Sequence, residues 1–434
     1  MILAAAQAHL EEWTQTAVLY VRPQAVNLLL GKERSFSFDI SGRPFGAFWE
    51  GMTYRRGLDN RWMAKWSERR DGRRARQRRW LKPEEARSLL ERAHRLAEAM
   101  RVKVLDGEAR SLDGDPLMDE DRERLLPALD RILALDWEAL EADRERFLKV
   151  YKPIGILPPD QYLALVLQAT EGCWHNACTF CTFYRDRPFR VKSPAEFEAH
   201  IQAVLEFFGP AVVLRRTIFL GDANALVIPF PRLMELFEVM NRQLPIAPGG
   251  SETIGGAPWP SARSHRFSGV YSFIDAFNVH RKSVDQWRML REGGLRRVYI
   301  GMESGDDGLL RFLNKPGTAA DVVQAVQRLK EAGIAVSVII LLGAGGEAYF
   351  DAHVQGTVQA VNAMPLRGGD IIYFSEFVEQ PGSAYIRLAR ATGIRPLDED
   401  RIREQERLMR SGFRWQDPSS PPRISLYDIR EFLY

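Results

Sequence analysis

Three cysteines lie within nine residues and are the only cysteines of the chain: Cys173, Cys178 and Cys181, in a C-x4-C-x2-C spacing. Three thiolates on one short loop can hold three corners of a cubane iron–sulfur cluster and leave the fourth iron open to an exogenous ligand. A tetrahedral zinc site completed by His175 is the alternative, although structural zinc sites usually draw paired ligands from two separate places. The spacing therefore predicts a metal centre at which chemistry can occur.

The cysteine loop, with Phe180 directly before its last cysteine, resembles that of the radical S-adenosylmethionine (radical SAM) superfamily. The usual spacing in that superfamily is C-x3-C-x2-C, so this loop carries one extra residue. The segment Gly301-Met-Glu-Ser-Gly305, followed by DDGLLRFLNKPGT, resembles a fourth-strand signature. That signature is typical of the branch with oxygen-independent coproporphyrinogen III oxidase, the Elongator catalytic subunit and cobalamin-associated enzymes. The segment 342–347, LGAGGE, fits the same pattern, and the resemblance covers roughly residues 160–385.

This resemblance implies a [4Fe–4S] cluster on the three cysteines and S-adenosylmethionine bound to the open iron through its amino and carboxylate groups. An electron from the reduced cluster would cleave a carbon–sulfur bond of the cofactor. The resulting 5′-deoxyadenosyl radical would then remove a hydrogen atom from a substrate that the sequence does not identify. The resemblance also implies an electron donor such as flavodoxin or ferredoxin, and it names no further catalytic residue.

The resemblance places cofactor-binding residues near the cysteines and after the second predicted strand. Gly221, with Asp222 or Asn224, occupies the place of a Gly-Gly-Glu element that holds the cofactor's amino group. The residues here differ from the Gly-Gly-Glu pattern, so either Asp222 or Asn224 could accept the hydrogen bond from the cofactor's amino group. Phe180 and Tyr184 are expected near the adenine or the cluster, and simple core packing is the alternative for both.

Four more candidates follow the fourth and fifth predicted strands. Glu303, next to Ser304, matches the position that binds the ribose hydroxyls, the alternative being an exposed loop acid. Lys315 falls where related enzymes place a basic residue near the cofactor's carboxylate, and a solvated lysine at a helix end is its alternative. Gly343 would let the backbone approach the adenosyl group, or would simply form a turn.

These residues require a scaffold that brings strand ends together, and the pattern from residue 162 onward predicts one. Apolar runs alternate with helical patterns, which favours right-handed βαβ units and a parallel sheet. We expect a partial (β/α)6 TIM-like barrel, whose site groups gather at the carboxyl ends of the strands. The predicted strands are 162–169, 212–220, 271–278, 297–302, 335–342 and 371–377, and the predicted helices are 194–208, 231–242, 284–292, 319–332 and 349–363.

The first 155 residues show a different pattern, which we interpret as a mostly helical extension with a possible short hairpin at 36–48. Helical spacing of apolar residues is clear at 83–100 and 121–150. We expect three parts: an N-terminal helical, basic region at 1–155, the radical SAM core at 156–390 and a C-terminal tail at 391–434 that packs on the barrel. A Gly-, Ser- and Pro-rich loop at 245–268 is long for such a connection and is expected to be mobile or functional.

Charge is unevenly distributed along the chain. Residues 54–82 carry twelve Lys/Arg against three acids, which is +9, whereas the whole chain is only +3 and the remainder is therefore −6. This basic arm also holds Trp62, Trp66 and Trp80, so it could bind nucleic acid such as tRNA. The alternatives are a solvated charged helix whose tryptophans 62 and 66 face the barrel, and a lid that carries cations toward a small anionic substrate.

Composition excludes several classes of protein. The low, odd cysteine count excludes a secreted domain framed by disulfides and suits a reducing cytoplasm. The N-terminus lacks the basic region of a signal peptide, and the longest apolar run, near 334–342, is too short for a membrane span. We expect a cytoplasmic enzyme acting on a small molecule. The alternatives are a silent cluster-binding carrier, such as a haem chaperone, a tRNA-modifying enzyme, and a zinc-stabilised nucleic-acid-binding protein.

Overall fold

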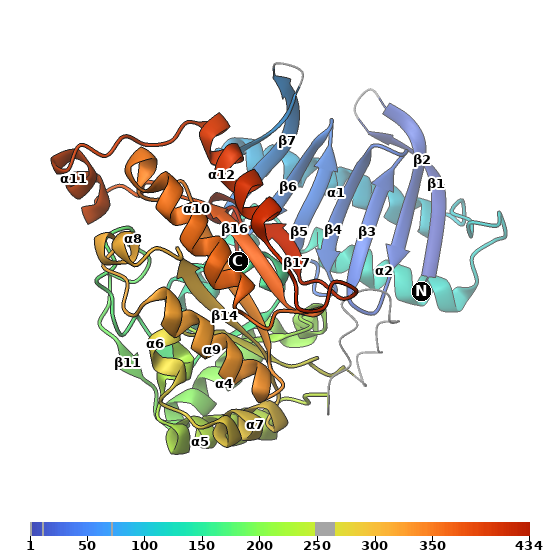
Figure 1. Cartoon of the computed structure of the whole chain (residues 1–434). Helices are drawn as coiled ribbons and strands as arrows, with labels where there is room; N and C mark the ends of the chain where they lie inside the picture. Colours follow the sequence, from blue (N-terminus) through green and yellow to red (C-terminus); the bar gives the residue numbers. More distant parts are fainter. Residues whose placement is uncertain (1, 11–12, 71–72, 248–264) are drawn as a thin grey trace.

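The computed structural model describes residues 2–10, 13–70, 73–247 and 265–434. Most of the loop singled out at 245–268 lies outside the described residues. The described chain forms two large sheets, an antiparallel one near the N-terminus and a parallel one whose first strand precedes the cysteine loop (Figure 1).

The parallel sheet has seven strands in the order β17-β16-β15-β14-β13-β12-β9, so each strand lies beside its predecessor in the sequence. This unidirectional order is that of an open, partial barrel and confirms the predicted architecture. The six predicted strands are all present, and the C-terminal tail contributes a seventh that was not predicted. The strands are β9 (Leu165–Gln168), β12 (Ile218–Gly221), β13 (Val270–Phe273), β14 (Leu295–Glu303), β15 (Ala335–Leu342), β16 (Ile371–Glu376) and β17 (Arg423–Leu426).

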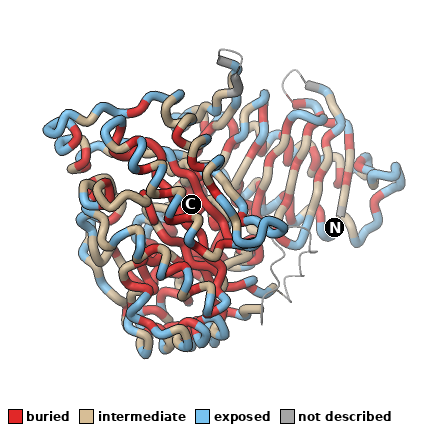
Figure 2. Tube along the Cα trace, in the orientation of Figure 1, coloured by how far each residue is buried: buried red, intermediate tan, exposed pale blue. Residues whose placement is uncertain are grey.

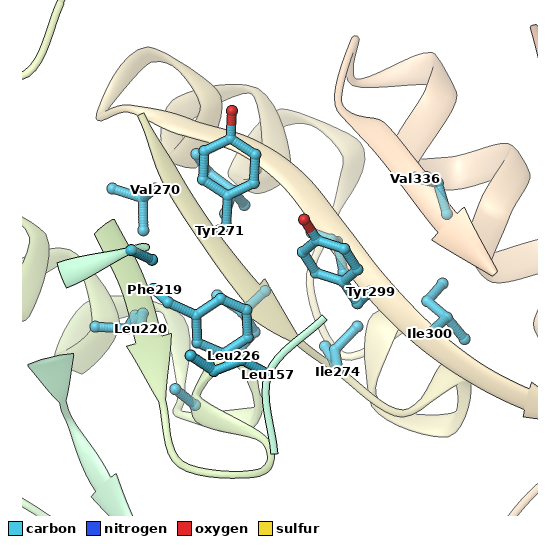
Figure 3. Close-up of a cluster of buried hydrophobic side chains, with 14 of the residues drawn as sticks. Leu157, Phe219, Leu220, Leu226, Val270, Tyr271, Ile274, Tyr299, Ile300 and Val336 are labelled. Carbon is cyan, nitrogen blue, oxygen red and sulfur yellow. The ribbon is translucent and has the colours of Figure 1, made fainter. Parts of the chain in front are cut away.

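The barrel strands other than the edge strand β17 are largely buried, as is typical of parallel sheets covered by helices. Every residue of β15 is buried, and the same holds for β9 and β12. Side chains fill the barrel interior: Phe219 contacts Tyr299 with ring centroids 6.0 Å apart, and Leu157 and Leu226 lie beside them (Figure 3). The lower part of the barrel is therefore a packed core, and only the strand ends are open to ligands.

Helices cover the outside of this sheet. They are α4 (Pro194–Phe208), α5 (Phe230–Gln243), α6 (Ala276–Val279), α7 (Val284–Glu292), α8 (Asp307–Phe312), α9 (Ala319–Glu331), α10 (Gly346–Asn362), α11 (Ala384–Ala391) and α12 (Glu399–Gly412). Local sequence sets their starts, since Ser193 and Thr318 each form a capping box ahead of α4 and α9. The stretch Pro194–Leu214 is long and apolar enough to cross a membrane, but half of its apolar window is buried within this fold.

Three predicted strand boundaries were wrong. The first predicted strand, 162–169, begins only at Leu165. The start of the second predicted strand, 212–214, belongs to a 3-10 helix, Gly209–Leu214, and β12 begins only at Ile218. The third predicted strand ends at Phe273, because the side chain of Asp275 accepts a hydrogen bond from the Asn278 amide and starts α6. An N-cap of this kind ends extended structure locally, whatever the apolar pattern beyond it.

The N-terminal region is not mostly helical, contrary to the prediction. The described residues between 2 and 80 form an eight-stranded antiparallel meander, β1 to β8 in sequence order, and the predicted hairpin at 36–48 is its β4–β5 pair. The strands are β1 (Ile2–Leu10), β2 (Trp13–Val21), β3 (Ala25–Leu30), β4 (Arg34–Asp39), β5 (Pro44–Trp49), β6 (Met52–Arg56), β7 (Trp62–Arg70) and β8 (Arg73–Trp80). The basic arm is therefore the three strands β6, β7 and β8 rather than a helix.

Burial alternates along these strands, which is the signature of a sheet with one covered face (Figure 2). Val26, Leu28 and Leu30 point to the covered face, where helices α1 (Pro83–Leu105) and α2 (Asp119–Leu133) pack. Trp62 and Trp66 are four residues apart, so on a strand they share this covered face instead of facing the barrel. The helical spacing at 83–100 and 121–150 is confirmed, with the second stretch split into α2 and α3 (Trp137–Val150).

The free edge of the barrel at β9 is closed by tyrosine hydroxyls. The Tyr434 hydroxyl accepts a hydrogen bond from the Val166 amide at 3.1 Å and reaches the Ala164 carbonyl at 3.1 Å. The Tyr151 hydroxyl donates to the Val166 carbonyl at 3.0 Å. Such caps satisfy backbone groups that an unpaired edge strand would leave exposed. The predicted domain limits near residues 155 and 390 remain predictions.

Candidate cluster and cofactor site

The cysteine loop follows β9 and the short strand β10 (Thr170–Glu171), which pairs with β11 (Arg190–Val191) at the loop's far end. All three cysteines are unpaired and partly exposed. Arg185 holds the loop closed, since its guanidinium donates to the Cys181 carbonyl at 3.1 Å and to the Cys178 carbonyl at 3.0 Å. The loop therefore presents its thiols from a backbone that is fixed by its own sequence.

A second segment, at the end of α8, anchors the same loop. The Thr179 amide donates to the Leu313 carbonyl at 2.9 Å, and the Asn314 side-chain amide donates to the Ala177 carbonyl at 2.8 Å. His175 Nε2 lies 2.8 Å from the Asn314 carbonyl oxygen. These contacts place the residue after Asn314, which is Lys315, beside the cysteines.

Lys315 and Glu303 form a buried ion pair, with Nζ 2.8 Å from Oε1. Burial opposes the charge on Lys315, but Glu303 and the nearby Cys178 raise the pKa of its ammonium above the ordinary value. Burial also raises the pKa of the Cys178 thiol to about 12, and Lys315 partly offsets this. A bound metal would favour the thiolate form of Cys178.

Asp222 connects the end of β12 to the cysteine loop. Its carboxylate accepts hydrogen bonds from the Gln168 side chain at 2.7 Å and from the Gly172 amide at 3.0 Å. It also pairs with Arg187 at 3.1 Å, and both side chains are buried. Burial raises the pKa of Asp222, whereas these donors lower it. The carboxylate thus fixes the residue directly before Cys173.

Asn224 belongs to a neighbouring polar network centred on Asp275. The Asn224 side chain accepts a hydrogen bond from the Asp275 amide at 3.0 Å and donates to its carboxylate. Trp174, inside the cysteine loop, donates from Nε1 to the same carboxylate at 2.6 Å. Sequence reasoning missed Asp275 and Trp174. The available signals were a tryptophan between the first cysteine and His175, and an aspartate that caps a helix after the third strand.

Three other predicted residues, Ser304, Tyr184 and Phe180, each make different contacts in the fold. The buried Ser304 hydroxyl lies 2.8 Å from His353 Nδ1 and accepts from the Asp306 amide at 3.0 Å. Tyr184 is buried, and burial raises its pKa, with the nearby Cys181 and Cys173 adding to the effect. Phe180 packs on the small apolar cluster that includes Leu309.

Gly343 stands at the end of β15 with a φ of 82°, a conformation that favours glycine. Its amide donates to Gln405 Oε1 at 2.8 Å, and a side chain there would contact Ile402. The structure therefore gives Gly343 a packing role against α12, and its role toward the cofactor remains a prediction. Gly221 ends β12 directly before Asp222.

The donor set fits an iron–sulfur cluster. Within the residues that the structure describes, no group of three or more His, Cys, Asp or Glu side chains converges on one metal ion. The thiolates of a cubane cluster each bind a different iron, so they need not converge on one point. The zinc alternative would use His175, whose Nε2 already faces the Asn314 carbonyl.

Comparisons with known proteins agree with this description. Residues 167–353 match the family model described as the radical SAM superfamily. This stretch runs from β9 to α10 and contains the cysteine loop, Asp222, Glu303, Lys315 and Gly343. Domains of this family bind a [4Fe–4S] cluster and S-adenosylmethionine. No curated protein matches the chain in sequence.

Several solved structures resemble the fold at low identity. The cobalamin-dependent S-adenosylmethionine radical enzyme OxsB is 15% identical with a TM-score of 0.35, and the match covers 55% of this chain but only 30% of OxsB. Coproporphyrinogen III oxidase (HemN) from Escherichia coli is 13% identical with a TM-score of 0.38, covering 61% and 55%. Elp3 from the archaeon Methanocaldococcus infernus is 13% identical with a TM-score of 0.35, covering 61% and 56%.

Proposed function

We propose, from the premise that residues 167–353 are a radical SAM domain, that this chain is an enzyme that removes a hydrogen atom from a small-molecule substrate. Cys173, Cys178 and Cys181 would hold the [4Fe–4S] cluster. When bound, the cluster and S-adenosylmethionine supply the reductive cleavage that generates the hydrogen-abstracting radical. The observation that carries this proposal is the cysteine loop anchored to the segment that bears Lys315.

The chain's own residues would orient the cofactor. Lys315 is a buried cation beside Cys178, where it can bind the cofactor's carboxylate. Glu303, held by Lys315 at the end of β14, can accept hydrogen bonds from the ribose hydroxyls with its second carboxylate oxygen. Asp222 and Asn224 are both engaged within the protein, and each keeps acceptor capacity for the cofactor's amino group. Phe180, Tyr184, Ser304 and the glycines 221 and 343 would line the same centre.

Anaerobic reconstitution tests this proposal. We expect about four irons and four sulfides per chain, and 5′-deoxyadenosine on reduction with dithionite or with a flavodoxin or ferredoxin donor. Cys178→Ala should lose both properties. If the variant kept them, the assignment would be wrong. A full cluster with no 5′-deoxyadenosine, together with haem binding, would instead identify a silent carrier.

A tRNA substrate is the second candidate, and the β7–β8 hairpin is the observation that favours it. Arg69 and Arg76 are exposed on this hairpin, and Trp80 is 43% exposed with Arg61 stacked 4.7 Å from its ring. Exposed arginines with an aromatic ring can bind phosphates and stack on bases. Filter binding of labelled tRNA at rising salt tests this candidate, and no retention at low salt would exclude it.

A further inference from the structure

A cavity of about 370 Å³ lies between the N-terminal sheet and the base of the barrel. One wall is the face of the sheet that α1 and α2 leave uncovered, and it includes Ser35, Thr53 and Arg55. The opposite wall consists of residues that precede β9 and β12, including Tyr162 and Arg215. The volume lies within the range of ordinary small-molecule sites.

Four arginines line this cavity, against one acidic residue, Asp39. Arg43 is neutralised, because its guanidinium binds Asp143 through two hydrogen bonds of 2.8 and 3.0 Å. The other three are Arg55, Arg56 and Arg215. A buried cavity whose walls carry this excess of positive charge is costly unless an anion balances it.

Two of these guanidiniums are more than nine-tenths buried and lack a full set of acceptors. Arg56 Nη2 and Arg215 Nε have no hydrogen-bond partner among the described residues. Arg56 Nε donates to Asn60 at 2.7 Å. Arg215 lies between the rings of Phe208 and Tyr434, 4.7 and 5.2 Å from their centroids. These rings fix the guanidinium without neutralising it.

Arg55 is the third arginine of the cavity and belongs to its sheet wall. Its guanidinium lies 4.9 Å from the ring centroid of Tyr162. The acids that act on these arginines also have other partners: Asp143 binds Arg43, Glu431 binds Lys65 and Asp59 binds Arg61. Asp39, the acid of the cavity itself, accepts a hydrogen bond from the Arg43 amide at 3.1 Å. Hydroxyls of Ser35 and Thr53 also line the cavity. Buried, unneutralised guanidiniums are the groups that proteins use to bind carboxylate and phosphate.

We propose that this cavity binds a small molecule through a phosphate or carboxylate group held by Arg55, Arg56 and Arg215. The site is separate from the cluster. Tyr162 and Arg215 precede β9 and β12, whereas the cysteine loop and Asp222 follow the same two strands, so the sites lie at opposite ends of the barrel. The bound molecule would bridge the N-terminal sheet and the barrel, and it would stabilise the fold by an amount that rises with the logarithm of its concentration above Kd.

Isothermal titration calorimetry tests the site with inorganic phosphate and with citrate, each against reconstituted protein in chloride buffer of matched ionic strength. We expect saturable binding of at least one probe. Phosphate alone indicates a phosphate-bearing ligand, and citrate alone indicates a carboxylate. No saturable binding of either probe up to about 10 mM would overturn the proposal.

Variants distinguish binding of the probe in the cavity from its binding to general surface charge. Arg55→Gln and Arg215→Gln should each weaken the bound probe about tenfold or more, because each removes a charged donor. Arg76→Gln, on the same sheet but outside the cavity, should leave the affinity unchanged. Since Arg215 is packed between two rings, the half-buried Arg55 is the decisive position if Arg215→Gln fails to fold. Unchanged affinity in Arg55→Gln would also overturn the proposal, whereas Cys178→Ala should bind the probe normally.

Discussion

At the scale of single residues, Asp222 is the strongest link between the barrel and the cysteine loop. Asp222→Ala would leave the buried Arg187 guanidinium with only Asp186 and the Pro153 carbonyl as hydrogen-bond partners among the described residues, and it would free the Gly172 amide. We expect a loss of about 2 kcal/mol in the free energy of unfolding, together with a lower iron content after reconstitution. Asp222→Asn keeps an acceptor for Gln168 or Gly172 and should lose less of both. Wild-type iron content and stability in the alanine variant would contradict this role.

Lys315 and Glu303 give a second residue-scale prediction, because the two are proposed to contact different parts of the cofactor. Lys315→Gln should weaken binding of S-adenosylmethionine about tenfold but leave 5′-deoxyadenosine binding unchanged, since that product lacks the carboxylate. Glu303→Gln should weaken both ligands, because both carry the ribose hydroxyls. Equilibrium binding to the reconstituted, unreduced protein measures each affinity. An equal loss of both ligands in Lys315→Gln would point to general disruption of the site instead.

At the scale of elements, the parallel strands were predictable because burial on both faces makes each one a continuous apolar run. The strand β15, AVSVIILL, is the clearest case. The motif residues followed from these strands, since Glu303 and Gly343 stand at strand ends. The partners of Asp222 and the Trp174–Asp275 contact could not be predicted, because they join residues about 50 and 100 positions apart.

The N-terminal strands were misread for a physical reason. β1 is rich in alanine and β8 is rich in arginine, and both are good helix formers. Antiparallel pairing with β2 and β7 overrides that local preference, as tertiary contacts often do. The alternation of buried and exposed residues in β3 carried the correct signal.

At the scale of elements, the hydrogen bond that joins α4 to β9 predicts how the free energy of unfolding depends on pH. His200 on α4 accepts a hydrogen bond from the Gln168 amide at 3.0 Å, and burial lowers its pKa to about 3. The unfolded chain, with an ordinary pKa near 6.5, therefore binds a proton that the folded protein excludes. This group's contribution to stability is complete above pH 6.5 and is lost as the pH falls toward 3. We expect the free energy of unfolding to fall by about 1.4 kcal/mol per pH unit from this group.

His200→Gln keeps an acceptor for the Gln168 amide but removes the titrating ring. Urea unfolding at several pH values between 5 and 7 should show a shallower pH dependence in this variant than in the wild-type protein. Identical slopes would mean that His200 is not excluded from protonation in the fold. The buried His353, whose pKa burial lowers to about 4, should maintain part of the slope in both proteins.

At the scale of the whole molecule, charged residues that lie far apart in the sequence form ion pairs in the fold. The basic arm lies beside the C-terminal tail, where Lys65 binds Glu431 and Arg78 binds Asp428 at 2.8 Å. The arm's excess of +9 is thus partly used to fasten the sheet to the barrel. Other cations of the arm are paired nearby, Arg79 with Glu85 and Arg61 with Asp59. The near-neutral net charge of the whole chain therefore gives no indication of these ion pairs between the basic arm and the C-terminal tail.

The Arg43–Asp143 pair should show how strongly the two halves of the molecule are coupled. Arg43, after β4, binds Asp143 on α3 and donates to the Phe207 carbonyl at 2.9 Å, so it joins the sheet to the helical side of the barrel. Removing one partner leaves a buried charge, and Asp143→Leu should cost about 3 to 5 kcal/mol. The double variant with Arg43→Met should cost less than the sum of the single variants, which a double-mutant cycle of urea unfolding measures.

The exposed Arg61–Asp59 pair is the matched control, and its coupling should stay below about 1 kcal/mol. Equal coupling in the two pairs would show that the buried contact does not unite the sheet and the barrel.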